Sequence, residues 1–173
     1  MEDYGRKIAL IQALSRTLTC GEADIPARVE ELVRNVRESA KELERLKVEA
    51  ALTDAESAVV NGRRIGETIL VRRDLQGAGP AYGKAFAERV ISQPGRTVVL
   101  VDSSPTAFQW IVAHSLGERL QLPAIVTPLL AAANAKGGGR TAWMQGAGRD
   151  AGSAESFGKA LEEALARALG SQA

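Results

Sequence analysis

The sequence predicts an α+β (or α/β) protein with two parts: a helical arm of two helices at residues 1–54 and a mixed-sheet domain covered by helices at residues 55–173. Two observations lead to this prediction. Apolar residues recur at helical spacing up to Asp54, and β-branched runs appear after it. The runs that predict strands lie at residues 58–60, 68–72, 97–102 and 107–114.

The arm begins with a short amphipathic helix. Its apolar residues are spaced three or four apart from Ile8 to Leu18, and Cys20-Gly21 closes the segment. A second helix begins at Asp24-Ile25-Pro26, because Asp can cap a helix and Pro suits the first turn, where its missing N–H costs nothing. We expect this helix to end near Asp54.

The second helix carries a heptad-like apolar seam, and charged residues occupy its other faces. Such a seam needs a partner, which is either the first helix folded back as a hairpin or a second copy of the chain in a homodimer. The seam residues are Val29, Leu32, Val36, Leu43 and Leu46.

The second part alternates strands and helices. A helix is expected over residues 80–92, a turn at residues 103–105 that makes a hairpin, and a helix over residues 123–135. Residues 142–145 are expected to form a short strand. A closing helix over residues 153–169 places Phe157, Leu161, Leu165 and Leu169 at a regular spacing of four, so it should cover the sheet.

Composition limits the classes of function. The 173 residues are 45% hydrophobic and carry 22 basic and 21 acidic residues, so a nucleic-acid surface would have to arise from local segregation of charge. The single cysteine, Cys20, excludes an internal disulfide, and no apolar run approaches the ~20 residues that span a bilayer. We expect a cytoplasmic protein with no membrane partner.

The most informative segment is Lys136-Gly137-Gly138-Gly139-Arg140. Glycines leave backbone N–H groups open to a phosphate, and the flanking cations can neutralise its charge, although such a run is also typical of a solvated turn. A P-loop is excluded, because the run does not end in Gly-Lys-Ser/Thr. The glycine spacing also does not match the Gly-x-Gly-x-x-Gly motif of dinucleotide-binding folds. The segment therefore favours nucleic acid over nucleoside triphosphate.

Other basic residues are candidates for phosphate contacts, with a solvated surface as the alternative. They are Arg149, the pair Arg63 and Arg64 in a Gly-flanked turn, and the pair Arg72 and Arg73 in a strand-like run. Trp143 can stack on a base, but a core position against the last helix is favoured. His114 is expected to be structural, and Asp102 to belong to a turn, because a nucleophilic serine beside it would need a positioned base.

The order of these parts resembles a known family. The helix that enters Lys136–Arg140, the strand Trp143-Met144-Gln145-Gly146, the Gly148-Arg149 turn and the closing helix with Glu162-Glu163-Ala164-Leu165 are similar to the DHH-associated domain at the C-terminus of alanyl-tRNA synthetases. The start Pro26-Ala27-Arg28-Val29 resembles the helical region that precedes it. The resemblance implies a module that binds tRNA, in particular the tRNA for alanine, and supports aminoacylation or editing by a domain absent from this chain.

The resemblance also limits what this chain does. The family's editing site uses several His and Cys zinc ligands, whereas this chain has only His114 and Cys20, too few for a usual zinc site. We therefore expect no catalytic residues, no metal and no cofactor here; zinc and ATP would belong to other domains of a ligase or a freestanding editing protein. Two alternatives stay open: the substrate-binding domain of a DHH-type oligonucleotide phosphoesterase, and a purely structural dimerisation module.

Overall fold

The computed structural model describes residues 2–171. Its contacts divide the chain into two compact units, and the division falls between Arg45 and Leu46. The elements are α1 (Glu2–Leu18), η1 (Glu22–Asp24), α2 (Ile25–Val60), β1 (Arg63–Ile65), β2 (Thr68–Gln76), α3 (Pro80–Val90), β3 (Arg96–Ser103), β4 (Phe108–His114), η2 (Gly117–Arg119), α4 (Leu122–Leu130), β5 (Ala135–Arg140), β6 (Trp143–Gly148), η3 (Ala151–Ser153) and α5 (Ala154–Gly170).

Helix α2 is longer than the sequence predicted. Residues 58–60 were expected to be a strand, but they form the last turn of this helix. Ala51 and Ala55 are fully buried one helical turn apart, and Ala58 and Val59 pack against the same core. Burial of this helical face against the sheet domain overrides the β preference of Val59 and Val60, which local propensity alone would favour.

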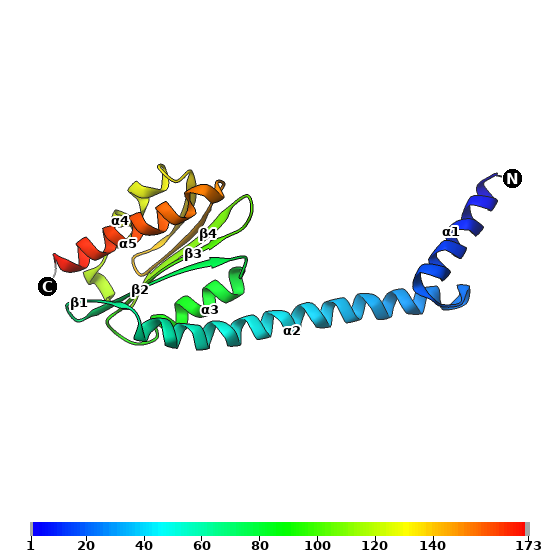
Figure 1. Ribbon diagram of the computed structural model, residues 1–173, viewed down its shortest axis with the longest axis horizontal. Helices are drawn as coiled ribbons and strands as arrows, with labels where there is room; N and C mark the ends of the chain where they lie inside the picture. The colour runs from blue at the N-terminus through cyan, green and yellow to red at the C-terminus, as the bar shows by residue number, and fades with distance from the viewer. Residues whose placement is uncertain (1, 172–173) are drawn as a thin grey trace. The chain divides into compact units, whose positions relative to one another are not determined.

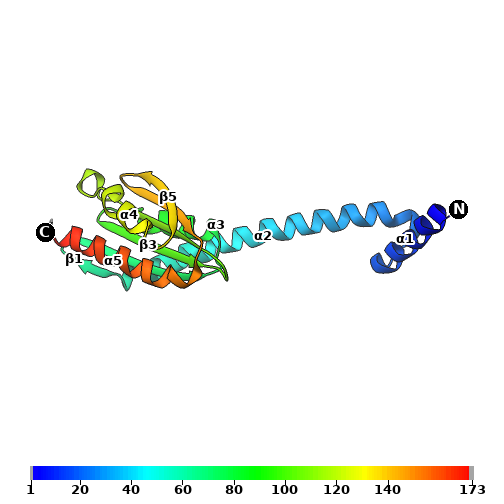
Figure 2. The ribbon, with the colours of Figure 1, turned by 90° about the horizontal axis from the view of Figure 1, so that it is seen from above.

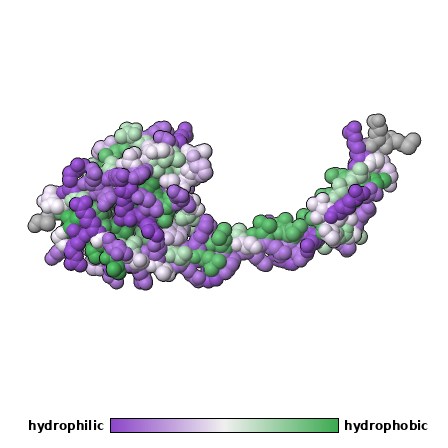
Figure 3. Space-filling model, viewed as in Figure 1, coloured by the Kyte–Doolittle hydropathy of each residue, from purple (hydrophilic) through white to green (hydrophobic). Residues whose placement is uncertain are grey.

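The apolar seam of α2 remains exposed. The five seam residues keep between 38% (Leu32) and 67% (Val36) of their surface accessible, and hydrophobic residues line one side of the helix in Figure 3. Within the described residues, α1 therefore does not cover the seam as a folded-back hairpin would.

The sheet has six strands in the order β1-β2-β3-β4-β6-β5. Only β2 and β3 run parallel, and α3 connects them; the other neighbouring pairs are antiparallel. The predicted hairpin between β3 and β4 is present, closed by the N–H of Ser104, which donates to the carbonyl of Ala107 at 2.8 Å. The predicted α+β class with a mixed sheet is confirmed.

Helices cover the two faces of the sheet unequally (Figures 1 and 2). On one face, α4 and α5 bury a large core around Trp110, Phe157 and Leu161. On the other face, α3 and the end of α2 bury a smaller core around Phe86, Leu100 and Ile111. This second cover lies over β2, β3 and β4 and reaches β6 only at Trp143, so β5 and the rest of β6 have an uncovered face.

The end of α2 is joined to α3 and β2 by one carboxylate. Asp54 accepts the hydroxyl of Tyr82 at 2.6 Å and a guanidinium N–H of Arg73 at 2.7 Å. Burial and the Asp54 contact together raise the pKa of Tyr82 to about 12. The phenol therefore stays protonated as a donor at all ordinary pH values.

Candidate nucleic-acid interface

The Gly-rich segment is the edge strand of the sheet. Residues expected to form a loop after a helix ending near residue 135 instead form β5, which pairs with β6 alone. An edge strand leaves a row of backbone N–H and C=O groups without a strand partner. The segment thus offers backbone donors, as expected from the sequence, but in extended rather than loop conformation.

Three glycines of this hairpin have backbone atoms where a side chain would have to lie. A Cβ atom would lie 2.4 Å from the Gln145 carbonyl oxygen at Gly137, 2.0 Å from the Trp143 carbonyl oxygen at Gly139 and 2.0 Å from the Lys136 carbonyl oxygen at Gly146. By contrast, a Cβ at Gly138 would meet no atom within 4 Å. Gly138 is therefore the one glycine of the run whose missing side chain leaves open space on the surface.

The register places the basic ends of β5 on the uncovered face. Residues directly opposite each other on neighbouring strands share a face, so three rows of side chains cross the sheet here. These rows are Lys136–Ala147–Gln109, Gly138–Gln145–Ile111 and Arg140–Trp143–Ala113. Ile111 and Ala113 lie under the helical cover, while Lys136, Gly138, Arg140, Gln145 and Gln109 are exposed. We call the exposed part of these rows, with Trp143, the open face.

The tryptophan that packs against the last helix is Trp110, not Trp143, for which the sequence favoured that position. Trp143 is half-buried, packs against the margin of the smaller core, and its indole N–H donates to the Gln145 side-chain oxygen at 3.0 Å, whereas the core position against the last helix belongs to Trp110. Trp110 is fully buried and packs edge to face against Phe157 of α5, with the ring centroids 5.8 Å apart. The prediction of a core position for Trp143 against α5 was wrong, because alternation along β6 directs Met144, not Trp143, to that core.

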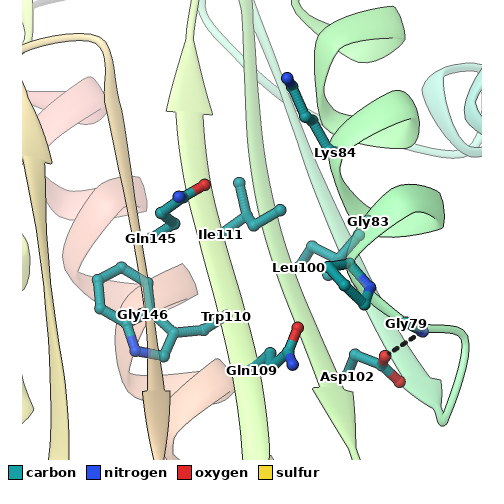
Figure 4. Close-up of a pocket in the computed structure, with 11 residues that line it drawn as sticks. Gly79, Gly83, Lys84, Leu100, Asp102, Gln109, Trp110, Ile111, Gln145 and Gly146 are labelled. Atoms are coloured by element: carbon teal, nitrogen blue, oxygen red, sulfur yellow. Dashed lines mark hydrogen bonds between the residues drawn. The ribbon is translucent and has the colours of Figure 1, made fainter.

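A cavity of about 330 Å³ adjoins the open face, between the start of α3 and strands β3, β4 and β6 (Figure 4). Lys84 of α3 stands on one side of it, and Gln109 and Gln145 on the other. Asp102 was expected in a turn but lies in β3, where its buried carboxylate accepts the N–H groups of Ala78 and Gly79 at 3.1 and 2.7 Å. These bonds fix the loop that begins α3.

His114 has the structural role expected of it. The residue is 2% exposed, and the N–H of Leu116 donates to Nδ1 of its ring at 3.0 Å. Because Nδ1 is an acceptor, the proton is assigned to Nε2, which donates to the Thr141 carbonyl at 2.9 Å. This bond holds the β5–β6 turn that separates Arg140 from Trp143.

The other predicted phosphate contacts lie away from the Gly-rich strand. Arg63 and Arg64 belong to β1, not to a turn, at the opposite edge of the sheet from β5. Five strand spacings separate these edges, which corresponds to ~24 Å. Arg149 follows β6 and is exposed.

Arg72 and Arg73 on β2 are both held in ion pairs. Arg72 contacts Asp74 at 2.8 Å and Glu162 at 3.3 Å, and Arg73 contacts Asp54. Alternation along the strand directs them to opposite faces of the sheet, and both line one cleft that lies at the sheet edge between α2 and α5. Of the predicted contacts, the structure thus brings Lys136, Gly137, Gly138, Gly139 and Arg140 together on β5, while Arg63, Arg72 and Arg73 line a separate cleft at the opposite edge. Sequence spacing contained no signal that Lys84 lies near the open face.

Within residues 2–171, no group of three or more His, Cys, Asp and Glu side chains is arranged to hold a metal ion. None of the helices in this part of the chain is long and apolar enough to cross a membrane.

Comparison with known proteins finds relatives among alanine-tRNA ligases. The chain is 28% identical to the ligase of Nostoc punctiforme over 147 residues, and 29% identical to that of a Nocardioides species over 153 residues. These alignments cover 82% and 84% of this chain but only 17% of each ligase. No protein-family model matches the chain.

A solved structure shares the fold. The C-Ala domain of alanyl-tRNA synthetase from Aquifex aeolicus superposes with a TM-score of 0.53 at 16% identity, over 61% of this chain and 97% of that domain. The resemblance to alanyl-tRNA synthetase expected from the sequence is confirmed by these relatives, and the α+β fold by this structure.

Proposed function

We propose that the chain is a tRNA-binding and assembly module, and that the open face is where RNA docks. One observation carries this proposal: Lys136, Arg140 and Trp143 share an uncovered sheet face with Gly138, which adds no side chain. The two cations can neutralise phosphates, and Trp143 offers an aromatic surface for a base. The similarity to alanine-tRNA ligases supports RNA, and the tRNA for alanine in particular, as the partner.

The proposed role of binding is positional. An RNA held on the open face would keep its reactive end near a catalytic domain joined to this module, which raises the effective concentration of that end. Within this proposal the chemistry, aminoacylation or editing, belongs to the other domain. The chain itself contributes affinity and placement.

The test is binding of folded tRNA by the whole chain across a salt series. For Lys136→Ala/Arg140→Ala we expect affinity to fall ~10–100-fold at 0.1 M salt, because two charge-assisted phosphate contacts are lost. The slope of log K against log salt should become shallower by ~1.4–1.8. Fluorescence anisotropy with labelled tRNA measures both quantities.

A control with the same change in charge is Lys159→Ala/Arg167→Ala, because both residues are exposed on α5, which covers the other face of the sheet. This variant should bind as the unaltered chain does. Equal losses of tRNA affinity in the two double variants would show that binding depends only on net charge. The proposal that RNA docks on the open face would then be wrong.

We also propose that the seam of α2 packs against a second copy of the chain. The regular spacing of its apolar residues and their exposure favour a helical dimer. Sedimentation equilibrium should give twice the chain mass, and Val36→Glu/Leu43→Glu should give the monomer mass without loss of helix, because both positions are exposed. A monomeric unaltered chain at tens of micromolar would contradict the proposal.

A further inference from the structure

A polar cleft of about 280 Å³ lies at the edge of the sheet opposite to β5. Its walls are the last turns of α2, with Ser57 and Asn61, and Glu162 of α5. Arg63, Arg72 and Arg73 line it from β1 and β2. The cleft therefore gathers three of the arginines that sequence spacing could not place together.

The cleft exists because β1 is shorter than β2. β1 pairs only with residues 68–70, so the edge of β2 beyond Leu70 has no strand beside it. The chain reaches β1 through Gly62, where a Cβ would lie 2.5 Å from the Ile69 side chain. This close passage leaves the end of α2 beside the free edge of β2, with the cleft between them.

Hydrogen-bond capacity in the cleft is unbalanced toward donors. Asp54 already accepts on both oxygens, from Tyr82 and Arg73, and Glu162 accepts from Arg72. By contrast, Arg63 makes no hydrogen bond or ion pair with any described residue, and the Nε–H of Arg73 is buried without a partner. A ligand that satisfies these groups must supply acceptor oxygens and negative charge.

We propose that this cleft binds a single phosphate group, with Arg63 as its principal contact. A guanidinium offers two parallel N–H donors that match a phosphate, and three guanidinium groups outnumber the two carboxylates of the cleft. The phosphate belongs either to an RNA backbone or to a free phosphorylated molecule. An RNA phosphate here rests on the proposed function, since the cleft would then be a second RNA contact ~24 Å from β5. A free phosphorylated molecule does not depend on that function.

The test compares Arg63→Gln with Arg64→Gln in the whole chain. The two arginines are adjacent and both exposed, but Arg64 lies opposite Ile69 on the other face of β1 and does not line the cleft. The probe is inorganic phosphate, titrated against chloride at matched ionic strength. The readout is the set of Nε–H signals of arginine side chains in ¹H–¹⁵N NMR spectra, which includes Arg73.

We expect a saturable shift in the unaltered chain and in Arg64→Gln. The half-saturation concentration should rise ~10-fold or more in Arg63→Gln, because a charge-assisted contact is lost. Lys136→Ala/Arg140→Ala should bind phosphate normally, so failure of the open face as an RNA site leaves this result unaffected. No saturable shift beyond the chloride control, or equal effects of Arg63→Gln and Arg64→Gln, overturns the proposal.

A second arm identifies the source of the phosphate. If the group belongs to RNA, Arg63→Gln should make the salt slope for tRNA shallower by ~0.7–0.9 and Arg64→Gln should not. If Arg63→Gln abolishes phosphate binding and leaves the tRNA slope unchanged, the cleft takes a free phosphorylated molecule.

Discussion

Trp110→Ala is expected to lower the free energy of unfolding by ~4 kcal/mol. Trp110 is fully buried between the sheet and α5, and its ring lies beneath Gly137 and Gly146, where a side chain on either would collide with it. Removal of the ring leaves a cavity that these glycines cannot fill. Among residues 2–171 the buried indole N–H has no hydrogen-bond partner, so removal of this unsatisfied group offsets a part of the cost. Urea denaturation followed by circular dichroism measures the change.

The matched control is Trp143→Ala, which removes the same side chain from the open face. Trp143 is half-buried and donates only to Gln145, so we expect a loss of stability of ~1–2 kcal/mol. Its tRNA affinity should fall while the fold persists. Equal destabilisation by the two substitutions would contradict the assignment of Trp110 to the core and Trp143 to the surface.

Gly146→Ala is expected to destabilise the protein by ~3 kcal/mol, although the change adds only one methyl group. The new Cβ would lie 2.0 Å from the Lys136 carbonyl oxygen and 2.6 Å from the Gly137 Cα, and both atoms belong to the backbone. Relief of the collision requires β5 to separate from β6. Chemical denaturation and loss of amide protection in β5 both report this separation.

Gly138→Ala provides the comparison, since its Cβ would meet no atom within 4 Å and its φ angle is not positive. We expect its stability to stay the same or to rise by up to ~1 kcal/mol, because alanine lowers the entropy of the unfolded chain. The methyl group would project from the open face, so under the proposed function it should change RNA affinity rather than stability. If Gly138→Ala destabilises the protein as much as Gly146→Ala does, both glycines are needed for packing. The assignment of Gly138 to free space on the open face would then be wrong.

Elements whose sequence signal is periodic and local were predicted correctly. The helices α1, α3 and α5, the strands β2, β3 and β4 and the β3–β4 hairpin follow from apolar spacing and turn residues. The predicted strand at residues 58–60 was wrong, because burial of Ala51 and Ala55 prolongs α2 through residues with β preference. The prediction of a loop at Gly137–Gly139 was also wrong, because glycine is typical of loops unless a neighbouring strand requires its small size.

The sequence by itself determined the α+β class, the apolar seam on a long helix, the Gly-rich segment with basic ends at Lys136–Arg140 and the resemblance to alanyl-tRNA synthetase. Each is carried by residues close together in the chain. The tertiary structure decided which basic residues meet: strand order places Arg63 at the opposite edge from Lys136, and strand register places Arg140 beside Trp143. It also decided which tryptophan is buried. Strand order and register arise from contacts between residues far apart in sequence, so local spacing does not contain them.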